Sequence, residues 1–158
     1  MIYSRLLAAS LLLALSAAVR AEVLINEIMY HPSSENPAEE YVELYNSGVA
    51  PVALTGWQFT NGVTFTFPNV SIAAGGYLVV AANQAAFTAK YPTVTNYVAG
   101  WTGQLSNSSN TLTLRDSLLV KMDEVDYSDD GDWGQRERDV PPSFAPNRAR
   151  ARATASRT

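Results

Sequence analysis

The stretch LINEIMYHPSSENPAEEYVELYNSGVAPVALTGWQFTNGVTFTFP, residues 24–68, reads as short strands separated by turn residues. Apolar residues alternate with threonines over 63–67, which is the period of a strand with one buried face. Asn61-Gly62 just before it predicts a tight type I′ turn back to residues 57–59. The stretch therefore predicts a series of antiparallel strands.

Similar signals continue on both sides of this hairpin. A continuous apolar run at 77–81 predicts a strand buried on both faces, and Asn83 is a good N-cap for one short helix over 84–90. This spacing of strands and turns is typical of an all-β sandwich. Further strands are predicted at 22–30, 40–46, 51–54, 111–115 and 122–127, with a loop at 31–38, an extended segment at 94–101 and a turn at 107–110.

The first 21 residues have a different character. Arg5 precedes a mostly apolar run over 6–19, and a small residue, Ala21, ends the segment. This order is that of a secretory signal peptide, and the run is shorter than the about 20 apolar residues that a spanning helix needs. We therefore expect a signal peptide at 1–21 and a secreted, periplasmic or cell-surface location, with a retained N-terminal anchor as the alternative. No other segment is expected to cross a membrane.

The chain of 158 residues contains no cysteine. Disulfides, a thiol nucleophile and cysteine metal sites are thereby excluded. Small secreted domains of eukaryotes tend to be stapled by disulfides, so a cysteine-free exported domain favours a bacterial origin. The hydrophobic share of 47% is enough for one packed core.

Charge divides the chain into two parts. Residues 22–133 hold 13 acidic and three basic residues, which argues against a nucleic-acid partner because phosphate binding needs clustered bases. Residues 134–158 hold six arginines, three prolines and one aromatic residue, and predict disorder because so little apolar surface can be buried. This basic segment is either an interaction tail or the product of a truncated or frame-shifted coding sequence.

Six motifs occur in order within residues 22–133: LINEIM at 24–29, EYVELYN at 40–46, VALTGW at 52–57, FTF at 65–67, Ile72 with GGY at 75–77, and DEVDY at 123–127. Together they resemble those of the lamin-tail domain, an immunoglobulin-like β-sandwich that is also found in exported bacterial proteins. The resemblance implies that 22–133 is one such sandwich. It also implies a module of larger exported proteins, in which kinase-like domains, nucleases or phosphatases are companions.

One acidic segment has the skeleton of a calcium-binding loop. Oxygen-bearing side chains alternate along it, and Gly131 would supply the sharp turn. Against this, the flank at 123–127 is strand-like, and Trp133 stands where a small aliphatic residue normally pairs the loop with a neighbour. We expect an acidic turn rather than a metal site. The candidate calcium ligands are Asp126, Ser128, Asp130, Asp132 and Glu137.

Glu27 and Glu43 lie in neighbouring predicted strands and are candidates for the carboxylate pair of a hydrolase. The simpler expectation is that each meets a Tyr hydroxyl, a backbone amide or solvent. His31 is the only histidine, so zinc is not expected, and no nucleophile elbow, phosphate loop or dinucleotide fingerprint occurs. We therefore predict no catalytic residue, no metal and no cofactor.

The three tryptophans and eight tyrosines are candidates for a carbohydrate or peptide platform. We expect most of them, Trp57 included, to lie in the core, and Trp101, between Gly100 and Gly103, to be the exposed one.

These expectations favour one function over two alternatives. The leading hypothesis is an exported, non-catalytic binding or adhesion module that contacts protein or glycan at the cell surface. The first alternative is the accessory domain of a larger exported enzyme, without its catalytic part. The second is a calcium-dependent structural module.

Overall fold

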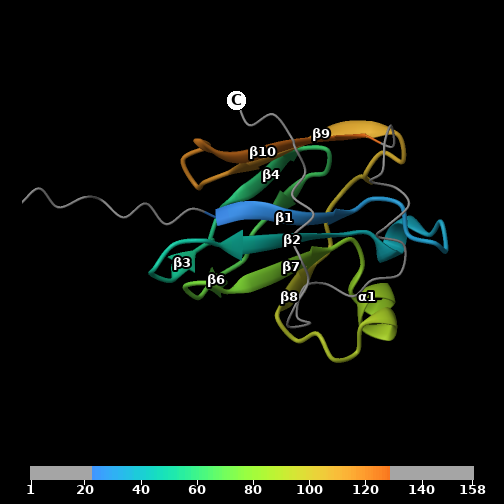
Figure 1. Ribbon diagram of the computed structural model, residues 1–158, viewed down its shortest axis with the longest axis horizontal. Helices are drawn as coiled ribbons and strands as arrows, with labels where there is room; N and C mark the ends of the chain where they lie inside the picture. Colours follow the sequence, from blue (N-terminus) through green and yellow to red (C-terminus); the bar gives the residue numbers. More distant parts are fainter. Residues whose placement is uncertain (1–22, 129–158) are drawn as a thin grey trace, which may run out of the picture.

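The computed structural model describes residues 23–128, which form two four-stranded sheets packed face to face (Figure 1). Sheet I has the order β1-β2-β7-β8 and sheet II the order β10-β9-β4-β5, while β3 and β6 form a separate two-stranded pair. All pairings are antiparallel except that of β7 with β8. The bounds are β1 (Val23–Met29), η1 (Pro37–Glu39), β2 (Tyr41–Asn46), β3 (Val52–Ala53), β4 (Gln58–Asn61), β5 (Phe65–Thr66), β6 (Ser71–Ile72), β7 (Tyr77–Ala81), α1 (Gln84–Lys90), β8 (Tyr97–Ala99), β9 (Ser109–Arg115) and β10 (Lys121–Ser128).

One hydrophobic core fills the space between the two sheets. Val42 and Leu44 of β2 face Phe59, Leu112 and Leu114 of sheet II, and all five side chains are fully buried. The intervening residues of β2 point to the opposite face of sheet I, as the period of two requires. The predicted all-β sandwich is confirmed.

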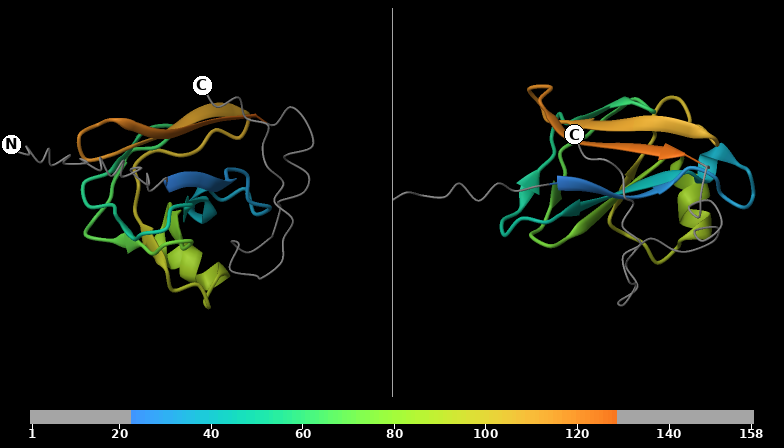
Figure 2. Two further views of the ribbon diagram at one scale, coloured as in Figure 1. Left: turned by 60° about the vertical axis from the view of Figure 1, so that its left-hand side comes forward. Right: turned by 45° about the horizontal axis from the view of Figure 1, so that its top comes forward.

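The short helix covers part of the outer face of sheet I (Figure 2). It begins where the side chain of Asn83 accepts a hydrogen bond of 3.0 Å from the amide of Ala86, as the N-cap prediction requires. Phe87 of α1 packs edge-on against Tyr41, at 5.9 Å between ring centroids, and contacts Val79 and Ala81. Strand β7 is thus buried on both faces, which explains its unbroken apolar sequence.

Contacts at both open sides join the two sheets to each other. On one side the Ile25 amide, at a bulge of β1, donates a 2.8 Å hydrogen bond to the Asp123 carboxylate of β10. On the other side Thr64 and Thr102 exchange two backbone hydrogen bonds of 2.9 Å. These contacts join the outer strands of the two sheets at single points, while β1, β8, β10 and β5 each have a strand neighbour on one side only.

The predicted strands and helix are confirmed, and β7 and α1 begin and end at the predicted residues. The 3₁₀ turn η1 covers the last two residues of the loop predicted at 31–38 and extends to Glu39. Strand β9 begins at Ser109, inside the turn predicted at 107–110. The signal peptide predicted at 1–21, the tail at 134–158 and Trp133 lie outside the described residues.

The predicted type I′ turn at Asn61-Gly62 is wrong. That turn needs a positive φ at both residues, and only Gly62 has one, at 80°. Asn61 instead continues β4 and pairs with Thr113 of β9, so the chain returns to β5 through a wider loop. A long-range pairing has overridden the local turn signal.

Candidate binding surfaces

The predicted carboxylate pair does come together, but both acids are bonded within the framework. Glu27 and Glu43 are direct partners across β1 and β2. The Tyr41 hydroxyl donates a 2.6 Å hydrogen bond to Glu27, and the Asn26 amide donates one of 2.7 Å to the fully buried Glu43. Burial, and then the charge of Glu27, hold the pKa of the Tyr41 phenol far above its usual range, so the proton stays on the phenol.

Two further polar residues of the motifs bind the loop that precedes β9. Glu40, only 2% exposed, accepts a 2.9 Å hydrogen bond from the Leu105 amide, and the Tyr127 hydroxyl accepts one of 2.9 Å from the Ser106 amide. Burial raises the pKa of the Glu40 carboxyl to about 7 and that of the Tyr127 phenol to about 12. These side chains satisfy buried backbone amides that no strand pairs.

Asn46 performs the same task for the loops around β3 and β6. Its side-chain amide donates to the carbonyls of Ala50, Ile72 and Ala73 at 2.8 to 3.1 Å, and its oxygen accepts from the Gly48 amide at 3.0 Å. The residue is fully buried. The last polar residue of the EYVELYN motif is therefore a hub of loop contacts.

Removing the carboxylate of Asp123 should cost more stability than removing a carboxylate on the outer face of the same strand. Asp123→Ala leaves the buried Ile25 amide without its acceptor, and we expect the free energy of unfolding to fall by about 2 kcal/mol. Asp123→Asn keeps an acceptor and should cost less. The control is Asp126→Ala, which removes an exposed carboxylate and should lower the free energy of unfolding by no more than about 0.5 kcal/mol. Equal losses in urea denaturation of the two alanine variants would contradict this role of Asp123.

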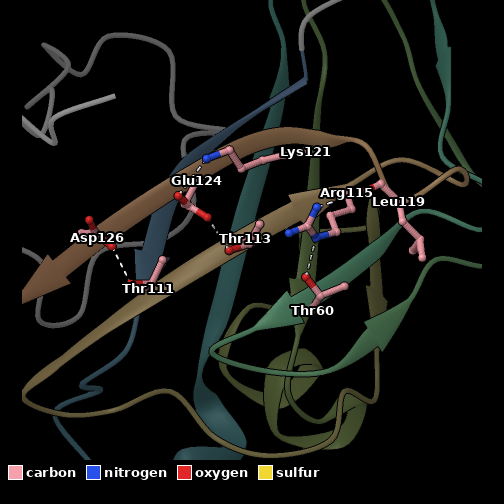
Figure 3. A network of polar contacts seen from close by, with 8 residues as sticks. All are labelled: Thr60, Thr111, Thr113, Arg115, Leu119, Lys121, Glu124 and Asp126. Atoms are coloured by element: carbon pink, nitrogen blue, oxygen red, sulfur yellow. Dashed lines mark hydrogen bonds and ion pairs between the residues drawn. The ribbon is translucent and has the colours of Figure 1, made fainter. Parts of the chain in front are cut away.

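The outer face of sheet II is polar, and its charged groups are bonded among themselves (Figure 3). Glu124 accepts from Thr113 at 2.9 Å and contacts the Lys121 ammonium at 3.0 Å, and these contacts, with that of Lys121 the larger, lower the pKa of its carboxyl. Arg115 donates to Thr60 at 3.1 Å, and Thr111 donates to Asp126 at 2.5 Å. Exposed pairs of this kind contribute little stability, and the face has the character of a solvated surface.

A tyrosine pair lies on the part of sheet I that α1 leaves uncovered. Tyr45 of β2 and Tyr77 of β7 are paired across the strands, with ring centroids 4.7 Å apart at 32°. Leu24 of β1 pairs with Tyr45 on the other side, and all three side chains are half-buried. We call Leu24, Tyr45 and Tyr77 the aromatic row; the exposed Asn26 lies next to it on β1. The row offers the ring faces of two tyrosines, and Asn26 beside it offers one side-chain amide.

The aromatic row could not be recognised from the sequence, because Tyr45 and Tyr77 come together only through the register of β2 with β7. Trp57 is 8% exposed, as expected, but the prediction of an exposed Trp101 is wrong, since it is also 8% exposed. The backbone pairing of Thr102 with Thr64 holds the loop against the sandwich, which places the neighbouring indole in the core. The outward position of Tyr45 follows from strand alternation, but its pairing with Tyr77 needs the register of two strands.

No group of three metal-ligating side chains occurs within residues 23–128. Asp126 and Ser128 of the possible calcium loop lie on β10 rather than after a helix, while Asp130, Asp132 and Glu137 lie outside the described residues. His31 is half-buried in its loop, with its ring 6.4 Å from that of Tyr30. Within the same range, no helix has the length and apolarity to cross a membrane.

These contacts define an immunoglobulin-like β-sandwich in which the buried polar side chains join strands and loops to one another. The chain belongs to the lamin tail domain family, whose model matches residues 16–129. The resemblance of its six motifs is thereby confirmed. A search of curated proteins found no match to this chain.

Proposed function

We propose that this chain is an exported, non-catalytic binding module that contacts protein or glycan at the cell surface. The observation that carries the proposal is the aromatic row, a half-buried tyrosine pair beside the exposed Asn26. Flat ring faces stack on sugar rings and on peptide side chains, and an adjacent amide supplies directional hydrogen bonds. The described residues carry nine acids against three bases, so a nucleic-acid partner is not proposed.

The framework role of the acids supports the absence of catalysis in this proposal. A general acid or base must reach a substrate, whereas Glu43 and Glu40 are buried and bonded to Asn26 and to the Leu105 amide. The signal-peptide pattern at 1–21 supports export, and the absence of cysteine supports a bacterial source.

Arrays of immobilised cell-surface glycans and of cell-surface proteins test the proposal. We expect binding that Tyr45→Ala and Tyr77→Ala each weaken at least roughly tenfold, because one aromatic contact is removed from the centre of the site. The phenylalanine variants at the same positions keep the ring and separate stacking from hydroxyl contacts. Thr60→Ala, on the outer face of sheet II, is the control and should bind like the parent chain.

Two results would argue against this assignment. Binding that survives both alanine substitutions would move the site away from the aromatic row. Hydrolysis of any arrayed glycan, abolished by Glu27→Gln but unaffected by Tyr45→Ala, would restore the carboxylate pair as a catalytic site.

A further inference from the structure

The Asn61-Gly62 pair, which does not form the tight turn that its sequence predicts, has a chemical reactivity of its own. Asn61 is the one asparagine of this chain that is followed by glycine. Asparagine deamidates when the backbone nitrogen of the next residue attacks its side-chain carbonyl carbon. Glycine has no side chain to shield that nitrogen. An asparagine before glycine therefore deamidates faster than one before a larger residue.

The two reacting groups lie close together at the surface. The Gly62 amide donates a 3.0 Å hydrogen bond to Oδ1 of Asn61, and the carbon to be attacked, Cγ, is bonded to that oxygen. Groups held this near to each other need little further ordering before a bond forms. Asn61 is exposed, and Gly62 lies just after the last residue of β4, so water also reaches the pair.

The fold requires the glycine but not the asparagine. A Cβ at position 62 would lie 3.2 Å from both the Leu112 side chain and the Thr111 carbonyl oxygen, and the φ of 80° is also unfavourable for other residues. Asn69 offers a comparison within the same chain. It is exposed as well, but the branched side chain of Val70 shields the following nitrogen.

We propose that Asn61 is a site of spontaneous deamidation through a cyclic imide, and that its isoaspartate product weakens the end of β4. A bond forms between the Gly62 nitrogen and Cγ of Asn61, and the bond from Cγ to Nδ2 breaks. The Gly62 nitrogen loses its proton, which leaves with the amide group as ammonia. Water then opens the ring at Cγ to give aspartate, or at the main-chain carbonyl to give isoaspartate.

The isoaspartate product is incompatible with the pairing at this point of sheet II. Asn61 pairs with Thr113 of β9, directly after a register shift between Phe59 and Asn61. Isoaspartate routes the main chain through its own side chain and so adds one atom to the backbone at the paired residue. Strand pairing depends on regular spacing of the backbone groups, so the Thr113 contact should be lost. The aromatic row lies on sheet I, so this inference does not depend on the proposed ligand contact.

Peptide mapping by mass spectrometry tests the site in the folded full chain, incubated in neutral buffer. We expect Asn61 to deamidate roughly tenfold or more faster than Asn69, with isoaspartate in excess over aspartate. The control is Asn61→Gln, which should stay unmodified at this position because its imide ring is larger and closes more slowly. Equal rates at Asn61 and Asn69 would overturn the site. Aspartate as the sole product would overturn the imide route.

Urea denaturation tests the effect on β4. The isoaspartate form, separated by chromatography from the incubated chain, should unfold at a lower urea concentration than Asn61→Asp. That variant has the same new charge but a backbone of normal length. Incubated Asn61→Gln should unfold like the fresh variant, which excludes damage elsewhere as the cause. Equal midpoints for the isoaspartate form and Asn61→Asp would overturn the loss of pairing.

Discussion

Asn46→Ala should lower the free energy of unfolding by about 3 kcal/mol, although the side chain of Asn46 is polar and is not itself a member of either apolar core cluster. The substitution removes four hydrogen bonds and leaves three carbonyls and one amide of the surrounding loops without that partner. The bond to Ile72 is buried and the other three are part-buried, and a group that loses its partner there costs on the order of 1 kcal/mol. Urea denaturation at neutral pH measures the loss.

Two further variants sharpen this result. Asn46→Asp keeps the acceptor for Gly48 but places a charge against the carbonyls of Ala50, Ile72 and Ala73, so it should destabilise at least as strongly. Asn69→Ala removes an exposed asparagine that is hydrogen-bonded to Thr55, and it should lower the free energy of unfolding by no more than about 0.5 kcal/mol. A loss below about 1 kcal/mol for Asn46→Ala would refute its role as a loop hub.

Glu40→Gln should be increasingly stabilising, relative to the parent chain, as pH rises from about 4.5 to about 7. The carboxyl is protonated in the folded chain up to a pKa of about 7, whereas in the unfolded chain it ionises near 4.5. Its contribution to stability is therefore fully present below about pH 4.5 and is lost as pH rises through 7. The loss amounts to roughly 3 kcal/mol, which the neutral glutamine avoids.

The measurement is the difference in unfolding free energy between Glu40→Gln and the parent chain at pH 4.5, 6 and 8. Subtraction removes the titration of groups that both proteins share. Glu124→Gln is the control, because the pKa of Glu124 is lowered from 4.5, so its contribution is lost only as pH falls below about 4.5 and its difference from the parent chain should stay nearly constant from pH 4.5 to 8. A difference for Glu40→Gln that is constant with pH would show that this carboxyl is ionised in the folded chain.

Residues close together in the sequence were enough to predict the strands, the helix and the inward-facing residues of β2. The threonine alternation at 63–67, the apolar run of β7 and the cap at Asn83 each depend on residues close in sequence, and all three agree with the structure. The placement of Val42 and Leu44 inward follows from the same period of two.

What local pattern missed depends on contacts between distant segments. The turn at Asn61 failed because β9 pairs with that residue, and Trp101 was misplaced because Thr64 pairs with Thr102. The aromatic row needs the register of β2 with β7. Leu119 has a φ of 65°, in the left-handed region, within a turn that the Asp116 carboxylate holds, and a leucine at that position does not indicate this conformation.

The polar residues of the motifs hold the framework, which leaves the outer surfaces for the proposed binding. Native-state hydrogen exchange tests it most directly, at the amides of Leu105 and Ile25, which donate to Glu40 and Asp123 rather than to a neighbouring strand. We expect both amides to exchange only through global unfolding, with the same free energy as amides in the middle of β2. Exchange of the Leu105 amide at the rate of an exposed loop amide such as that of Ser108 would contradict it.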